Sequence, residues 1–178
     1  PKDPANMTLS DVITGVGCIA RDSIQSVAGT DLLFLSATGV QSLQRVIQEK
    51  SLPFRDVSKN VRDELLSNVA TETVENIKAI YYPTDAMYLL SLPATDTTYC
   101  FDTRGTLQNG AARTTTWSGI TPTAYCVTDD RKLYIGKVGY IGNYTGNLDN
   151  GSSYRMAYYT NYLDFQAATN IKILKKII

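Results

Sequence analysis

Two pairs of adjacent carboxylates are the first places in this sequence to look for hydrolytic chemistry. Asp63-Glu64 and Asp129-Asp130 each put two acids side by side, and glycosidases use two carboxyl groups, one as acid and one as nucleophile or base. Asp129-Asp130 stands where a hairpin turn is expected, and Asp63-Glu64 stands on the charged side of a predicted helix. Because turn formation and surface charge account for both pairs, the sequence predicts that the chain is not an enzyme.

Residues that commonly bind metals or act as nucleophiles are scarce. The chain has no histidine, which removes the most frequent general base and metal ligand. Its three cysteines, Cys18, Cys100 and Cys126, contain no C-x-x-C pair, and we expect them to be buried free thiols. No phosphate-binding glycine loop and no nucleophile elbow is present. The sequence therefore predicts no catalytic residue, no metal and no cofactor.

One loop in the second half resembles the Asp-box, the pattern S-x-D-x-G-x-T-W. Asp149 and Gly151 match it, and Asn147, Ser153 and Tyr154 are conservative replacements for Ser, Thr and Trp. In families that carry it, the box is a structural hairpin between the third and fourth strands of a blade and is not itself catalytic. An Asp side chain can accept backbone N–H groups in such a turn, and Gly can take the positive φ. We expect a structural turn here.

Charge and hydropathy exclude several classes of function. Seventeen basic residues balance seventeen acidic ones in 178 residues, which argues against a broad nucleic-acid footprint because that requires clustered excess Lys and Arg. No apolar stretch approaches the roughly 20 residues of a membrane span. Twelve tyrosines against four phenylalanines suit half-buried strand faces and protein contacts, where the ring packs and the hydroxyl stays in water.

A cassette of short strands and turns occurs three times. Its central strands carry one aromatic residue between apolar ones: Leu33-Phe34-Leu35, Met87-Tyr88-Leu89 and Leu133-Tyr134-Ile135. Repeats of about 40 to 50 residues are typical of propeller blades, and a blade is a sheet of four short antiparallel strands. The sequence predicts a mainly β fold with β-propeller-like blades of four antiparallel strands, about three in this chain, and one inserted α-helix.

The inserted helix is predicted from apolar residues at every fourth position after the Pro53 turn, namely Val57, Val61, Leu65 and Val69. Charged residues between them indicate an amphipathic helix from Asp56 to about Ile77. We expect Asp56 or Ser58 to cap its N-terminus.

The predicted organisation follows from these patterns. Residues 1–17 form a leading segment, 18–47 a blade-like unit, 48–76 a linker with the amphipathic helix, 77–121 and 122–166 two further blade-like units, and 167–178 the start of another strand. Within 77–121 we expect strands at 77–82, 86–92, 98–102 and 113–117. Within 122–166 we expect them at 123–128, 132–136, 139–144 and 154–165. The chain itself is interpreted as a fragment of a larger protein.

The residue pattern of the predicted strands resembles that of the nozzle proteins of short-tailed bacteriophages, also called tail tubular protein B. Those proteins carry degenerate propeller blades. The residues that carry the resemblance are the Trp-ended segment 113–119, the segments 123–127 and 132–135, the closing pair 154–165 and 170–176, and 54–58 ahead of the helix. A second Trp expected near Trp117 is absent, and Ile120 stands close by.

The resemblance implies a structural role in the virion tail. The chain would belong to a ring of its own copies, six in the family, that forms the distal tube of a short tail. That ring would contact tail adapter and fibre proteins, and viral DNA would pass through it without sequence-specific binding.

A carbohydrate-binding or sialidase-like propeller acting on host surface glycans is the alternative. A sialidase site would need an arginine cluster, for which Arg113, Arg131 and Arg155 are the candidates near the blades. A sugar-stacking platform would use Tyr154, Tyr158, Tyr159 and Tyr162. The acids near the blades are turn aspartates and the glutamates all precede Ile77, so the sequence favours the structural role.

Overall fold

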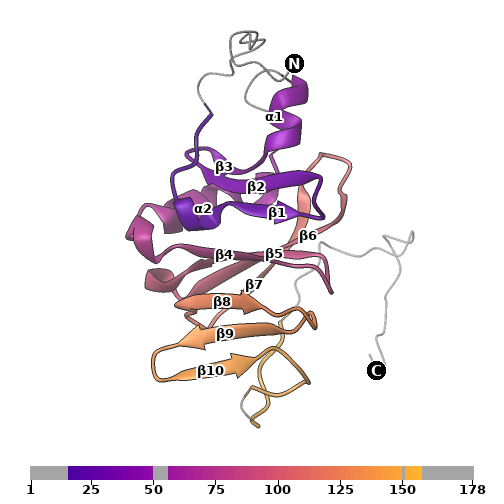
Figure 1. Cartoon of the computed structure of the whole chain (residues 1–178). Coiled ribbons are helices and arrows are strands. Elements are labelled where there is room, and N and C mark those ends of the chain that lie inside the picture. Colours follow the sequence, from indigo (N-terminus) through magenta and orange to yellow (C-terminus); the bar gives the residue numbers. More distant parts are fainter. Residues whose placement is uncertain (1–15, 50–55, 150, 158–178) are drawn as a thin grey trace, which may run out of the picture. The chain divides into compact units, whose positions relative to one another are not determined.

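Figure 1 shows the computed structural model of the chain, which describes residues 16–49, 56–149 and 151–157. The chain divides into two compact units, Pro1–Tyr144 and Thr145–Ile178. The first unit contains all the named helices and strands of the described residues, and the second contains one short hairpin turn.

Three small antiparallel sheets make up the first unit (Figure 1). Sheet A consists of β1 (Gln25–Val27), β2 (Asp31–Ser36) and β3 (Gly39–Ser42). Sheet B consists of β4 (Lys78–Tyr82), β5 (Met87–Leu92), β6 (Thr97–Thr106) and β7 (Ala112–Trp117). Sheet C consists of β8 (Ala124–Val127), β9 (Leu133–Lys137) and β10 (Tyr140–Asn143). Each strand pairs with its neighbour in sequence, so every sheet is a meander. The predicted mainly β class is confirmed.

Helical elements lie between and beside the sheets. The described residues include α1 (Leu43–Glu49) and α2 (Arg62–Val69), together with the 3-10 turns η2 (Arg21–Ser23), η3 (Lys59–Val61), η4 (Val74–Asn76) and η5 (Pro93–Thr95). α1 follows β3 directly and contacts β2 and β3. α2 lies in the connection between sheets A and B, where the inserted helix was predicted.

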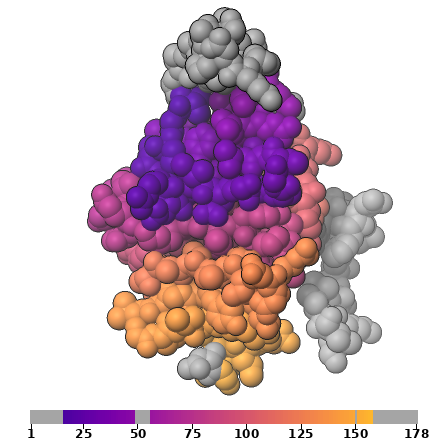
Figure 2. Space-filling view, viewed as in Figure 1, coloured from indigo at the N-terminus to yellow at the C-terminus, as the bar shows by residue number. Residues whose placement is uncertain are grey.

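Sheet B is packed on both faces, because successive side chains of a strand point to opposite sides. In β5, Tyr88 and Leu90 enter one core together with Leu35 of sheet A. Leu89 enters a second core with Leu133 of sheet C. The first strands of the sheets are neighbours, since β1 contacts β4 and β4 contacts β8 (Figure 1). In the space-filling view, indigo sheet A, magenta sheet B and orange sheet C follow one another as bands (Figure 2).

The strand predictions hold best in the middle of the chain. All four strands expected within 77–121 form sheet B, and three of the four expected within 122–166 form sheet C. In sheet A we expect turns at 28–31 and 37–39 from the sequence. Residues 28–30 and 37–38 do connect the strands, whereas Asp31 and Gly39 are already the first residues of β2 and β3. In the described residues the three sheets do not close into a ring.

Four strands in every unit was wrong, because sheets A and C have three each. After β3 the chain forms α1 instead of another strand, since Leu43, Val46 and Ile47 recur at helical spacing and Val46 is buried against sheet A. Of the fourth strand expected at 154–165, residues 154–157 form no strand, and 158–165 lie outside the described residues. The inserted helix predicted in the linker 48–76 is α2, and α1 is a further short helix that was not predicted.

The helix prediction was right about the buried side and wrong about length and cap. Val57 and Leu65 are buried in the first core, and Val61 and Val69 pack against it. α2 spans only Arg62–Val69, and its N-terminus receives no side-chain cap. Asp56 and Ser58 instead turn inward: both are buried and bond to other partners.

Cysteine burial was predicted correctly for one residue in three. All three thiols are free, but Cys18 and Cys126 are exposed and Cys100 alone is buried. Cys126 lies on the face of sheet C opposite to Tyr125 and Val127, which pack toward sheet B. Burial raises the pKa of the Cys100 thiol to about 11.

Candidate functional site

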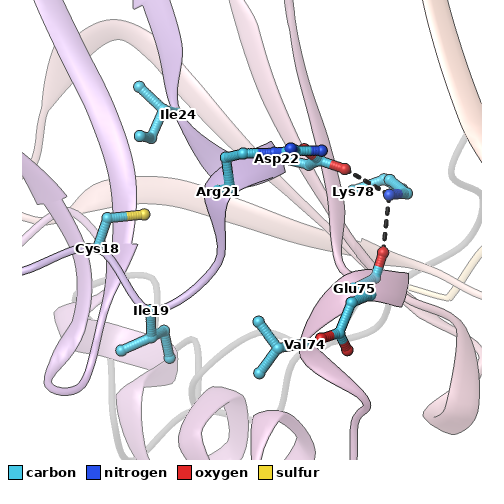
Figure 3. Close-up of a pocket in the computed structure, with 8 residues that line it drawn as sticks. All are labelled: Cys18, Ile19, Arg21, Asp22, Ile24, Val74, Glu75 and Lys78. Atoms are coloured by element: carbon cyan, nitrogen blue, oxygen red, sulfur yellow. Dashed lines mark hydrogen bonds and ion pairs between the residues drawn. The ribbon is translucent and has the colours of Figure 1, made fainter.

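One hollow of the described surface lies where η2 and η4 approach each other (Figure 3). Its volume is about 710 Å³, and it is lined by apolar residues, including Ile19, Ile24 and Val74, and by a charged rim. A smaller groove of about 290 Å³ adjoins it, and the two share Cys18 and Ile24. Together they form a partly apolar surface around Ile24, the residue that precedes β1.

The charges on the rim of the larger hollow pair with one another. Asp22 Oδ2 accepts from Lys78 Nζ at 2.5 Å, and Asp22 Oδ1 accepts from Arg21 Nε at 3.0 Å. These hydrogen bonds, that of Lys78 first, hold the pKa of the Asp22 carboxyl below its usual value. Lys78 also donates to the backbone oxygen of Glu75 at 2.7 Å. The rim thus carries two basic and two acidic residues, and the carboxylate of Asp22 pairs with both basic side chains.

The thiol of Cys18 opens into the same hollow (Figure 3). It donates to the backbone oxygen of Ala20 at 2.9 Å and lies 3.6 Å from Ser23 Oγ. Within the described residues, no group of three or more Cys, Asp or Glu side chains gathers in a geometry that could hold a metal ion.

The contacts that hold sheet A on sheet B are polar as well as apolar. Tyr88, fully buried, donates its hydroxyl to the backbone oxygen of Ser23 at 2.7 Å, and its pKa is strongly raised by burial. Gln25 Nε2 donates to the backbone oxygen of Ala79 on β4 at 3.0 Å. The first bond joins sheet B to η2, just ahead of sheet A, and the second joins β1 of sheet A to β4 of sheet B, so both fix the position of sheet A on sheet B.

A second polar contact joins sheets B and C. The Tyr125 hydroxyl of β8 hydrogen-bonds Ser91 Oγ of β5, and Ser91 Oγ lies 2.8 Å from Thr98 Oγ1 of β6. Burial raises the pKa of Tyr125 to about 12. A buried hydroxyl that loses its partner is costly, so this set favours one arrangement of the two sheets.

The segment 56–58 links the outer strands of sheets A and B. Val57 N–H donates to Val40 O of β3, and Ala112 N–H of β7 donates to Val57 O, both at 3.0 Å. Ser58 Oγ accepts from Val40 N–H at 2.9 Å. Asp56 is buried and ion-pairs with Arg62, the first residue of α2.

The predicted Asp-box-like turn lies in the second unit. Asp149 and Ser152 exchange backbone hydrogen bonds of 2.8 and 2.9 Å, and Gly151 has φ +83°. This is a tight two-residue turn with glycine in the left-handed region, as the pattern requires. Asn147, Ser153 and Tyr154 are exposed. Its structural role in a blade stays a prediction.

The carboxylate pairs have local partners. Asp130 Oδ1 accepts from Thr128 Oγ1 at 2.5 Å, and its Oδ2 ion-pairs with Lys132 at 2.6 Å; these bonds, that of Lys132 first, lower its pKa. Glu64 accepts from the Tyr99 hydroxyl at 3.1 Å. Asp130 thus stabilises a hairpin turn, and Glu64 joins α2 to sheet B.

The candidates for a glycan site come from different elements. Arg113 lies on β7, Arg131 lies in the β8–β9 turn and Arg155 belongs to the second unit. Tyr154 is exposed, and the other tyrosines of the proposed platform lie outside the described residues. Elsewhere, Trp117 and Tyr144 stack with ring centroids 5.5 Å apart.

Sequence reasoning missed the hollow beside β1 and the inward roles of Asp56 and Ser58. The hollow is formed by residues distant in sequence, such as Ile24 and Val74, and no local pattern pairs them. In the structure the Ser58 hydroxyl fits into the space beside Gly39, where an added Cβ would lie 2.4 Å from Ser58 Oγ, and the glycine at position 39 is the trace of this contact in the sequence.

No helix of the described residues is long and apolar enough to cross a membrane. No family model, no curated protein and no solved structure matches the chain.

Proposed function

We propose that this chain is a structural component of a phage tail, forming part of the tubular nozzle through which DNA is ejected. The observation that carries the proposal is the packing of three consecutive meanders, with β1 beside β4 and β4 beside β8. Neighbouring propeller blades pack around a common axis in this way. In the proposal, sheets A, B and C are successive blades, and further blades come from outside the described residues.

The strands that carry the sequence resemblance support the same proposal. The Trp-ended segment is β7, and the two segments after it are β8 and β9, which pair in one sheet. These three strands follow one another across the contact between sheets B and C. The segments that resemble the nozzle family therefore lie at the contact between sheets B and C.

The proposed mechanism is mechanical. The nozzle must stay rigid while DNA moves through it, and buried hydroxyl contacts such as Tyr88 to Ser23 and Tyr125 to Ser91 fix each sheet on the next. A chain with equal numbers of acidic and basic residues suits such a conduit, because strong phosphate contacts would slow the passage of DNA. The proposed partners are other copies in a ring, six by resemblance, and tail adapter and fibre proteins.

Immunogold electron microscopy tests this proposal. An antibody raised against the 178-residue chain is applied to particles of the virus that encodes it. Label at the tip of a short tail is the expected result. Label at the capsid or on no part of the particle contradicts the proposal.

A glycan-binding propeller is the second candidate, and one observation favours it. Tyr144 is 41% exposed while it stacks on Trp117, and exposed aromatic faces of this kind can stack on a ligand ring. A glycan array with the whole chain, compared with a Trp117→Ala variant, tests it. Binding that depends on Trp117 would favour this candidate over the conduit.

A further inference from the structure

Strand β10 is an edge strand of sheet C within the described residues, where it pairs with β9 on one side only (Figure 1). Tyr144 N–H, directly after β10, donates to Leu133 O at 2.8 Å. Positions that bond to the neighbouring strand alternate along an antiparallel strand. The backbone groups of Gly142 therefore also face β9, and those of Ile141 and Asn143 point to the open edge.

The third strands of the other two sheets have an outer partner. In sheet A, Val40 of β3 accepts from Val57 N–H at 3.0 Å and donates its own N–H to Ser58 Oγ at 2.9 Å. In sheet B, β7 pairs along β6. In sheet C the residues that follow β10 do not form such a strand, because the described residues of 145–157 contain only an isolated bridge.

β10 lacks the features that keep free edges of sheets apart. Such edges are usually protected by charged side chains, proline or a bulge. Residues 138–144 contain no charged residue and no proline, and β10 pairs with β9 in a regular register. The apolar side chains around the edge are open to solvent: Val138 is 88% exposed, Ile141 76% and Tyr140 57%. An edge strand of this kind is a template for pairing with another chain.

We propose that β10 pairs with β10 of a second copy of this chain, antiparallel and around a two-fold axis at Gly142. In this register Ile141 lies opposite the partner's Asn143, and the two exchange N–H and C=O, so the open backbone groups of both copies are paired. The strand suits pairing with itself, because no like charges meet across the axis. The two three-stranded sheets then become one continuous sheet.

The two-fold contact is separate from the ring of the proposed function. An isologous contact closes after two copies, whereas a ring needs a different contact between each copy and the next. The pairing therefore describes the free chain and does not depend on the proposed function.

Sedimentation equilibrium of the whole chain at micromolar to millimolar concentration tests the proposal. The mass should rise with concentration from 19.6 kDa to twice that value and no further. Ile141→Lys removes an exposed apolar side chain from the edge and brings two like charges close to the axis, so it should raise the dimer dissociation constant by about tenfold or more. Ile47→Lys is the matched control, because it makes the same exchange at an exposed position of α1, and it should leave the constant unchanged.

A disulfide at the axis tests the register. The two Gly142 residues form a pair without hydrogen bonds, in which the Cα atoms lie about 4.5 Å apart, a spacing that suits a disulfide. A Cβ added at Gly142 meets nothing closer than Ile135 O at 3.9 Å. Oxidation of the Gly142→Cys variant should therefore join two copies through the introduced thiols, which mass spectrometry distinguishes from the natural exposed thiols of Cys18 and Cys126.

Three results would overturn the proposal. The first is a mass of 19.6 kDa at every concentration. The second is a dimer that is equally stable in the Ile141→Lys variant, because the contact would then lie elsewhere. The third is oxidation that joins copies of the Gly142→Cys variant only through Cys18 or Cys126.

Discussion

Gly39 is the position where one added methyl group should do most damage. It starts β3 with φ +128°, a backbone conformation that L side chains rarely adopt, and a Cβ there would lie 2.4 Å from Ser58 Oγ. The backbone strain of Gly39→Ala costs about 1–3 kcal/mol. The Ser58 hydroxyl must also move away from Val40 N–H, and an unpaired buried N–H costs about 1–3 kcal/mol. We expect the free energy of unfolding to fall by roughly 3–4 kcal/mol in total.

The assay is urea unfolding followed by the fluorescence of Trp117, the only tryptophan, which packs in the core between sheets B and C. Gly29→Ala is the matched control, because Gly29 has φ +70° but nothing within 4 Å of its added Cβ. It should cost only about 1 kcal/mol. If Gly39→Ala proves no more destabilising than Gly29→Ala, the close approach of segment 56–58 to β3 is refuted.

Three further predictions concern the hydroxyl contact of Tyr125, the ionisation of buried tyrosines and the Asp102–Arg104 pair. Tyr125→Phe removes one of the two hydroxyl partners of Ser91 and leaves Thr98, so it should cost about 1 kcal/mol in urea unfolding. No loss would mean that the hydroxyl contact does not form. Burial raises the pKa of Tyr99 and Tyr125 to about 12. The unfolded chain ionises tyrosine near pH 10, so their contribution to stability should be complete below pH 10 and lost toward pH 12. Tyrosinate absorbance at 295 nm should show that Tyr99, Tyr125 and the fully buried Tyr88 ionise late; ionisation of every tyrosine near pH 10 contradicts their burial. The Arg104 hydrogen bond lowers the pKa of Asp102 to about 2, and in a carboxyl NMR titration Arg104→Ala should return it toward 4; an unchanged value argues against the pair.

The sequence predicts strands well where alternation and turn residues agree. Sheet B was predicted strand by strand because Tyr88 and Leu90 alternate with Leu89, and both sets are apolar in a sheet that is packed on two sides. α1 was missed although Leu43, Val46 and Ile47 have helical spacing, because the repeat suggested that a strand should follow. The repeat therefore predicted the number of sheets better than the number of strands in each.

Side-chain roles were harder to predict than elements. Asp56 and Ser58 have the residue types of helix caps but take other roles in the structure. Ser58 accepts a hydrogen bond from Val40 of β3, and Asp56 forms an ion pair with Arg62. That choice depends on the approach of β3, which is distant in sequence. The hollow beside β1 depends on η2 and η4 meeting in space, so its lining could not be predicted from local patterns.

The central claim is the proposal that this chain belongs to the tail of a phage, and a cryo-electron microscopy reconstruction of particles of the phage proposed to encode it tests that claim most directly. The account predicts that the unit Val16–Tyr144 fits density in the wall of a short tail, repeated around the tail axis, with sheets A, B and C as neighbouring blades around a smaller axis of their own. Density for this unit outside the tail, or a tail wall into which the three stacked sheets do not fit, would contradict the account.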